Sequence, residues 1–307
     1  MGAVEAADEV TEETFQHTPV MPDEVLRTLR PERGGVFLDA TVGGGGHAAR
    51  LLEAGPAVRV IGIDQDPEAI EAAGRRLAAF GDRVTLMEAN FRDIGRLEIA
   101  RDIEGLAGAL MDLGVSSHQI DTQARGFSFR PGTSLRMRMG GTTGEGEPAA
   151  ELLNEGDVQE LGRIFRAGEE RRWRALSREV VRRRRIRPFR TSGDLVAALE
   201  AVLGRPASEK EKARLFQAVR IAVNDELAAL SEGLDEIRGR LAAGGRLVVL
   251  AYHSLEDRVV KRRFRGWGAE CVCPPGLPEC RCRGRSLGRV LTKRPLRPAP
   301  EEVARNP

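Results

Sequence analysis

Four consecutive glycines at positions 43–46 follow an apolar run that begins at Val36 and includes Asp39. An apolar, partly β-branched run that ends in glycines is typical of a buried parallel strand followed by a tight turn and a helix. Glycine suits such a turn because it has no Cβ, so its backbone can adopt positive φ and approach a ligand closely. The helix expected over residues 46–54 then points its free N–H groups toward whatever the loop holds.

A second predicted strand, residues 59–64, ends in Asp64, which lies 18 positions after Gly46. An acidic residue about 20 positions beyond a glycine-rich turn is where nucleoside-binding α/β folds hydrogen-bond the ribose. Dinucleotide enzymes place their first glycine directly after the strand, whereas Asp39 stands four residues ahead of the glycines here. An acid at that place suits a ligand with an ammonium group, such as the methionine half of S-adenosylmethionine. The pattern favours a methyltransferase, and an NAD-type oxidoreductase stays open as an alternative.

Strands and helices alternate through the first third of the chain. Helices are expected over residues 67–80 as well as 46–54, and strands over residues 36–42, 59–64, 83–89 and 108–114. Such alternation predicts one parallel sheet with right-handed crossovers, in which ligands bind outside the carboxyl ends of the strands. The side chains expected at those ends are Asp39, Asp64, Phe91 and Asp112.

The alternation stops after the fourth strand. No convincing strand occurs between Ser117 and about Leu227, where helical patterns cover residues 169–187 and 209–229. A fifth strand is expected over residues 245–253, followed by a basic helix over 254–265. The chain is therefore predicted to be an α/β protein with a helical domain inserted between two strands of one sheet. The predicted units are a disordered acidic tail (1–14), the first part of the sheet domain (15–116), the inserted helical domain (117–227), and the second part with an irregular C-terminal tail (228–307).

The charge distribution permits nucleic acid as a partner. Five of the 46 acidic residues lie in residues 1–14, which hold no Lys or Arg, so 48 basic residues face 41 acidic ones in the remainder. Residues 171–190 hold ten Arg against the single acid Glu179. Clustered positive charge is what phosphate neutralisation requires, although such a run is often only a solvated face. No apolar stretch approaches the ~20 residues of a membrane helix and no signal peptide is present, so we expect a cytoplasmic protein with no membrane partner.

All four cysteines of the chain lie in the C-terminal tail, as Cys271, Cys273, Cys280 and Cys282. Four thiolates at this spacing could bind tetrahedral zinc. Four thiols on an irregular tail need no metal, and disulfides are rare in the cytoplasm. Zinc therefore stays open, and the sequence assigns no metal site.

Seven motifs in one order resemble those of the bacterial RsmH (MraW) family, from about His17 to the C-terminus. The motifs are His17-Thr-Pro-Val-Met21, Asp39-Ala-Thr-Val-Gly-Gly-Gly-Gly-His47, Gly62-Ile-Asp-Gln-Asp-Pro67, Leu110-Met-Asp-Leu-Gly-Val-Ser-Ser117, Arg125-Gly-Phe-Ser-Phe129, Leu215-Phe-Gln-Ala-Val-Arg-Ile221 with Val223-Asn224 and Glu226-Leu227, and His253-Ser-Leu-Glu-Asp-Arg258. The resemblance implies a Rossmann-like class I S-adenosylmethionine-dependent methyltransferase that methylates N4 of a cytidine in the decoding region of 16S ribosomal RNA. Its partner would be the small ribosomal subunit, and DNA is not expected as a substrate.

The resemblance also implies which residues bind the cofactor. Carried over by motif, these are Gly45, Gly46, His47, Asp64, Phe91, Asp112 and Gln119. Phe91 would lie near the adenine and Asp64 at the ribose.

Two departures from the family pattern bear on function. Where the family reads Leu-Asp-Met-Arg-Met-Asp, this chain has Arg136 and Gly140 in place of the two acids. We expect that loop to lie near the substrate, so a non-catalytic RNA-binding or assembly factor with the same fold stays open. The family also continues past the place of Pro307 with an Arg-rich run and a last strand, so we expect a truncated C-terminus and leave the edge of the sheet unassigned.

The expected chemistry demands an acceptor beside the target amino group. The N4 lone pair of cytosine is delocalised into the ring, so a catalyst must accept its hydrogen bonds and align it with the methyl group. We predict Asp112 as that acceptor, helped by Ser116 or a backbone carbonyl, and His253 as a weaker candidate for taking the proton. A strand-end acid such as Asp112 can instead merely cap the next turn. Amino-methylating DNA enzymes use an acid or Asn, two prolines and an aromatic residue here, and this chain lacks the prolines and the aromatic.

The target base must be single-stranded or flipped out to be reached. The basic segments over residues 169–190 and 254–265 are predicted to hold the RNA backbone.

Overall fold

The computed structural model describes residues 19–97, 105–116, 119–120, 122–140, 148–273, 279, 281–282, 284–292 and 294–305. The predicted acidic tail, residues 1–14, and Cys280 lie outside these described residues.

Five strands form one parallel sheet in the order β3-β2-β1-β4-β5. They are β1 (Gly35–Asp39), β2 (Val58–Asp64), β3 (Val84–Glu88), β4 (Leu106–Asp112) and β5 (Leu241–Leu250). The chain runs outward from β1 to β3 and then returns to the other side of β1, so the strand order reverses between β1 and β4. Ligands bind at such a reversal in open α/β sheets, and the predicted Rossmann-like α/β fold is confirmed.

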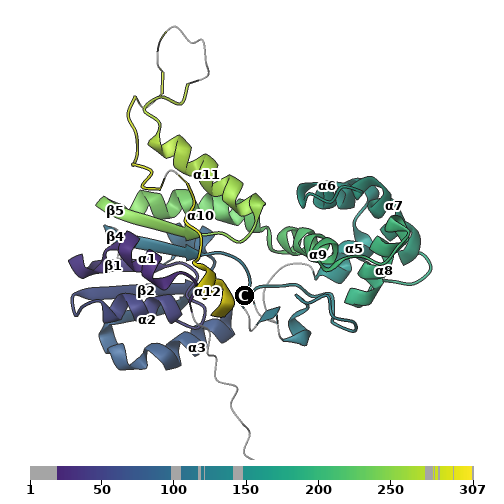
Figure 1. Cartoon of the computed structure of the whole chain (residues 1–307), viewed down its shortest axis with the longest axis horizontal. Helices are drawn as coiled ribbons and strands as arrows, with labels where there is room; N and C mark the ends of the chain where they lie inside the picture. Colours follow the sequence, from purple (N-terminus) through teal and green to yellow (C-terminus); the bar gives the residue numbers. More distant parts are fainter. Residues whose placement is uncertain are drawn as a thin grey trace, which may run out of the picture.

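Helices cover both faces of the sheet (Figure 1). One face packs against α1 (Pro22–Leu29), α2 (Gly46–Glu53) and α3 (Pro67–Leu77), through a buried cluster that includes Leu51 and Leu77. The other face packs against the 3-10 helix η3 (Phe91–Arg96), α10 (Glu226–Arg240) and α11 (Ser254–Gly268), through a cluster that includes Leu234 and Ile237. The three layers hold the carboxyl ends of the strands in fixed positions.

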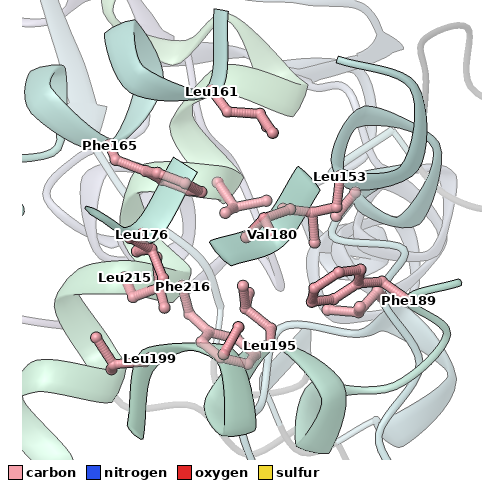
Figure 2. Close-up of a cluster of buried hydrophobic side chains, with 14 of the residues drawn as sticks. Leu153, Leu161, Phe165, Leu176, Val180, Phe189, Leu195, Leu199, Leu215 and Phe216 are labelled. Atoms are coloured by element: carbon pink, nitrogen blue, oxygen red, sulfur yellow. The ribbon is translucent and has the colours of Figure 1, made fainter. Parts of the chain in front are cut away.

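The described helices between β4 and α10 surround a core of their own. They are η5 (Gln123–Arg125), α5 (Ala149–Glu155), α6 (Val158–Ala167), α7 (Trp173–Arg184), α8 (Ser192–Leu203) and α9 (Glu209–Asn224). The buried members of this core lie between Leu135 and Val219, and Figure 2 shows Phe165, Val180 and Phe216 among the side chains that fill it. We call this part the insertion, and Figure 1 shows it beside the sheet. Its predicted domain boundaries, residues 117 and 227, stay a prediction.

Several predicted element boundaries are wrong. The helix predicted over residues 169–187 begins only at Trp173, because Glu169 has φ 63° and Glu170 turns its carboxylate back to accept from the Arg172 amide at 2.9 Å. The helix predicted over 209–229 is two helices, since Asp225 has φ 49° between α9 and α10. The fifth strand ends at Leu250, before the predicted end at residue 253.

The C-terminal tail also differs from the prediction of an irregular segment. It contains a short helix, α12 (Pro300–Arg305), whose Glu302 accepts a hydrogen bond from the Met21 amide. In the described part of the chain, no helix combines the length and the apolar character needed to span a bilayer.

A buried ion pair ties the insertion to the sheet. Arg125 donates from Nη2 to Asp66 Oδ2 at 2.6 Å and from Nη1 to Asp66 Oδ1 at 3.2 Å. The side chains of both residues are under 5% exposed. Asp66 also caps α3 by accepting from the Glu68 amide at 3.2 Å, so one carboxylate fixes a helix start and the position of the insertion.

Candidate active site

A cleft opens at the carboxyl ends of β1, β2 and β4, between the sheet and the insertion. Seven of the predicted site residues line it, namely Gly46, His47, Asp64, Phe91, Asp112, Ser116 and Gln119. Met139 and Asn224 line it from the insertion side, and Tyr252 from the segment after β5. The predicted residues Gly45 and His253 are not among the lining residues. The structure therefore brings most of the predicted site residues together. It adds lining residues from the insertion and from the segment after β5.

The glycine loop shapes one end of the cleft. Gly43 and Gly45 have φ values of 49° and 78°, which only glycine adopts at little cost. A Cβ on Gly45 would also lie 3.2 Å from the Leu77 side chain and 3.4 Å from the Ala73 backbone. Gly45 thus serves the turn and the close approach of α2 to α3 rather than the cleft surface.

Asp64, at the end of β2, is held by backbone amides. Its Oδ2 accepts from Gly43 at 2.9 Å and its Oδ1 accepts from Asp66 at 3.0 Å. Burial raises the pKa of Asp64 to about 6. A carboxylate oxygen can accept more than one hydrogen bond, so this fixed group retains the capacity to bind a ribose hydroxyl.

Asp39 and His47 place unpaired polar atoms under the glycine loop. Asp39 is 1% exposed, and its Oδ2 has no hydrogen-bond partner among the described residues. His47 is 7% exposed, and neither of its ring nitrogens has a hydrogen-bond partner in the described part of the chain. Buried polar atoms without partners cost free energy unless a ligand or water satisfies them. This donor and acceptor set fits a polar cofactor beside the loop.

Burial raises the pKa of Asp39 from 3.8 to about 7, with His47 opposing the rise. Because the folded state holds this proton more tightly than the unfolded chain, the contribution of Asp39 to stability falls as pH rises from about 4 to about 7. We expect the free energy of unfolding of Asp39→Asn to equal that of the parent chain near pH 4. At pH 8 the variant should be more stable by roughly 2–4 kcal/mol. Urea denaturation of both ligand-free chains across this range checks it. A difference that does not change with pH would contradict it.

Asp112 contacts three separate segments around the cleft. Its backbone amide donates to Thr41 Oγ1 at 2.7 Å, which joins β4 to the glycine loop. Its Oδ1 accepts from the Tyr252 hydroxyl at 2.7 Å, and its Oδ2 lies 3.6 Å from His47 Nε2. Partial burial and the charge of Asp112 raise the pKa of Tyr252, so the phenol remains a hydrogen-bond donor at neutral pH. Asp112 thus faces the cleft as an oriented carboxylate.

Ser116 and Gln119 form a small turn beside Asp112. The Ser116 amide donates to Gln119 Oε1 at 3.1 Å, and the Gln119 amide donates to Ser116 Oγ at 3.2 Å. Gln119 Nε2 donates to Asp66 Oδ2 at 2.8 Å. The side-chain amide of Gln119 is therefore used in the buried network that carries Arg125, which limits what it can offer to a cofactor.

His253 caps α11 instead of facing the cleft. Its Nδ1 accepts from the Glu256 amide at 3.3 Å, and its Nε2 lies 3.0 Å from Glu256 Oε1. The cleft-lining Glu226 is held by Arg220 through two hydrogen bonds of 2.8 and 2.9 Å. The role predicted for His253 as proton acceptor finds no support in this arrangement.

Phe91 begins η3 and lines the cleft as predicted, next to α10. A Cβ at Gly233 of α10 would lie 2.5 Å from the Phe91 ring, so glycine allows the ring to settle against the helix. Its neighbour Asn90 donates to Gln65 Oε1 at 2.9 Å. The ring is thus held at the end of β3, where an adenine platform is expected.

The loop that departs from the family pattern reaches the cleft through Met139. Asn224 holds it, because its Oδ1 accepts from the Met139 amide at 2.8 Å and its Nδ2 donates to the Met137 carbonyl at 2.7 Å. Arg136 is exposed, and its carbonyl accepts from the Ala149 amide at 3.1 Å.

Two contacts of Asp112 are not predicted from the sequence: Thr41, and Tyr252, which is expected inside a strand. A local pattern gave no signal for either contact. Both join segments that are distant in the sequence.

Fold and site together define a class of protein. A parallel sheet in the order 3-2-1-4-5, a glycine loop after the first strand and an acid at the end of the second are the features of a Rossmann-like class I methyltransferase. The glycine loop, Asp64 and Phe91 line the cleft where the cofactor of such an enzyme binds.

Comparison with known proteins gives the family. Residues 14–307 match the model of the MraW methylase family. The chain is 46% identical over 301 residues to a ribosomal RNA small subunit methyltransferase H of Heliobacterium modesticaldum, covering 95% of each chain. It is 47% identical over 303 residues to the protein of the same name from Syntrophotalea carbinolica, covering 97% of this chain and 96% of that one. The chain belongs to the MraW methylase family: it is a methyltransferase, and its cofactor is S-adenosylmethionine.

Proposed function

We propose that this enzyme methylates the exocyclic N4 of a cytidine in the decoding region of 16S ribosomal RNA. Both relatives described above carry the name ribosomal RNA small subunit methyltransferase H. The observation that carries the proposal is the oriented Asp112 carboxylate, which accepts from Tyr252 at the cleft and is positioned to accept from a second donor.

The side chains around the glycine loop would hold the cofactor. Asp64 would bind its ribose, Phe91 would lie near its adenine, and the loop with His47 would face its methionine end. The unpaired atoms of Asp39 and His47 support this assignment, since a cofactor supplies the partners that the described residues do not. S-adenosylmethionine supplies an electrophilic methyl group on a positively charged sulfur.

Asp112 then acts on the target base. Tyr252 donates to one oxygen of this carboxylate. The carboxylate would also accept a hydrogen bond from the N4 amino group, which localises the lone pair on that nitrogen. Tyr252 is 55% exposed, so its ring also offers a face against which a flipped base can stack. Asp112 is the group placed to receive the proton that N4 loses.

The surface of the insertion offers contacts for an RNA backbone. Arg171, Arg178 and Arg185 are exposed, and their side chains make no hydrogen bond or ion pair to another described residue. By contrast, Arg182 and Arg183 pair with Glu179, at 2.7 Å each. The unpaired guanidinium groups on and beside α7 are therefore the ones available to phosphates.

The proposed reaction is tested directly on ribosomal subunits. We expect the chain to transfer labelled methyl groups from S-adenosylmethionine to small subunits that lack this modification. Mass spectrometry of the digested RNA should identify N4-methylcytidine. Cofactor binding without any methylated nucleoside would favour the non-catalytic assembly factor, and protection by NADH alone against thermal unfolding would favour an oxidoreductase.

The RNA contact has its own test. Replacing Arg171, Arg178 and Arg185 together by Glu should weaken the salt dependence of RNA binding. The plot of the logarithm of the binding constant against the logarithm of salt concentration should become less steep by about 2, because each phosphate contact contributes about 0.7 for single-stranded RNA. Binding titrations over a salt series check this. A matched triple reversal of the exposed Arg27, Arg50 and Arg75, on α1, α2 and α3, should leave the slope unchanged. Equal slopes for the two triple variants would refute the assignment.

A further inference from the structure

We propose that Cys271, Cys273 and Cys282 form a structural zinc site beyond the end of α11. The three sulfur atoms all lie within 4.8 Å of one another. Tetrahedral zinc with Zn–S bonds of about 2.3 Å places two ligand sulfurs about 3.8 Å apart, so small shifts would bring all three into coordination. Three sulfurs leave one tetrahedral position for a fourth ligand. The site lies outside the cleft and is independent of the proposed reaction.

A backbone hydrogen bond points to thiolate chemistry at this cluster. The Val272 amide donates to Cys282 Sγ at 3.4 Å. A donor aimed at sulfur favours the charged thiolate, which is the form that binds metal. The same contact sets Cys282 against the turn that carries Cys271 and Cys273. The three sulfur atoms are therefore close together, and the Val272 amide donates to one of them.

The described residues around the cluster bury few apolar side chains. Beyond the cluster, the Leu287 amide donates to the Trp267 carbonyl of α11 at 2.7 Å. The apolar side chains described in this segment are exposed, with Val272 at 48% and Leu287 at 39%. A loop without a core must be closed by another interaction, because its closure costs conformational entropy. Zinc held by ligands from both ends of the loop supplies that closure.

The charge around the cluster also suits a thiolate-bound ion. Zinc with three thiolates carries one net negative charge. Arg281 lies next to Cys282 in the sequence and is exposed, and Arg289 follows further along the same segment. The proposed site would thus fix a basic loop at the end of α11 in one conformation.

Metal titration tests the proposal on the full chain. The reduced protein, stripped with a chelator, should bind one equivalent of Zn²⁺, and Co²⁺ should produce a thiolate-to-cobalt charge-transfer band with the d–d spectrum of a tetrahedral site. Cys271→Ser and Cys282→Ser should each lose the band and lower zinc affinity by about 100-fold or more. Ser286→Ala, in the same segment, is the matched control and should bind as the parent chain does.

Protease protection gives a second readout. Trypsin should cut after Arg281 in the metal-free chain, and Zn²⁺ should slow that cut in the parent chain and in Ser286→Ala but not in Cys282→Ser. Zinc binding without a charge-transfer band from cobalt would place the ion at the Glu226, His253 and Glu256 group, whose ligand atoms also lie within 4.8 Å of one another, and would overturn the proposal. So would a lack of zinc binding by the reduced chain.

Discussion

Asp112→Asn should slow methyl transfer by about 10²- to 10⁴-fold while S-adenosylmethionine affinity changes by only a few-fold. Asparagine has the size of aspartate, and its carbonyl oxygen can still accept from the Tyr252 hydroxyl. Its amide nitrogen donates where the carboxylate would accept, so it can neither hold the N4 amino group nor take its proton. Single-turnover rates and calorimetric cofactor affinities, measured on the same preparations, separate the two effects.

Tyr252→Phe is the matched variant for this prediction. It removes the hydroxyl that donates to Asp112 and keeps the ring that a base would stack on. We expect a smaller loss of rate than for Asp112→Asn, because the carboxylate is kept and loses only one of its contacts. Near-normal turnover in Asp112→Asn would show that another group accepts from the base. A loss of cofactor affinity with normal turnover at saturation would make Asp112 a binding residue.

Arg125→Met should lower the free energy of unfolding by about 3–5 kcal/mol. The substitution leaves the buried Asp66 carboxylate without the guanidinium that pairs with both of its oxygens. Gln119 and the Glu68 amide still donate to Asp66, but neither carries a positive charge. Since the pair joins the insertion to the sheet, we also expect unfolding to separate into two transitions. Denaturant unfolding followed by circular dichroism and by tryptophan fluorescence checks both results, measured in a Trp267→Phe background that leaves Trp173 of the insertion as the single tryptophan.

An exposed pair of the same chemistry is the control for Arg125→Met. Arg75 pairs with Glu71 along α3, and both side chains are more than 60% exposed. Arg75→Met should cost less than about 1 kcal/mol, because exposed ion pairs are weak. A second control combines Arg125→Met with Asp66→Asn. This double variant should recover part of the lost free energy of unfolding, because it removes the buried carboxylate charge that has no guanidinium partner. Equal losses in Arg125→Met and Arg75→Met would mean that the buried pair contributes no more than a surface pair.

The parallel sheet could be predicted because its signals are local. Each strand is an apolar run, and the glycines at 43–46 and Asp64 stand at its turns in the expected order. The breaks in the helices could not be predicted in the same way. At Asp225 the chain keeps a helical composition on both sides, and Arg92, more than 130 residues earlier, pairs with its carboxylate at 2.9 Å. Such a contact leaves no trace in a window of neighbouring residues.

The site was predicted in part for the same reason. Strand-end acids could be placed at the cleft by counting strands, but the hydrogen-bond partners of Gln119 and His253 depend on tertiary packing. The loop after Asp112 lacks the aromatic residue that amino-methylating DNA enzymes carry there, and Tyr252, which follows β5, contacts Asp112 instead. The two residues are adjacent because β4 and β5 pair in parallel register, with Asp112 opposite Leu250.

The separate core of the insertion has a consequence for how such an enzyme can change over time. The residues buried in it lie between Leu135 and Val219, whereas the glycine loop, Asp64 and Asp112 belong to the segments before it. Mutations on the outer surfaces of α6, α7 and α8 can accumulate without disturbing the layers around the sheet. The outer surface of the insertion and the glycine loop are thus encoded in different stretches of one gene, and substitutions in one need not pass through the core of the other.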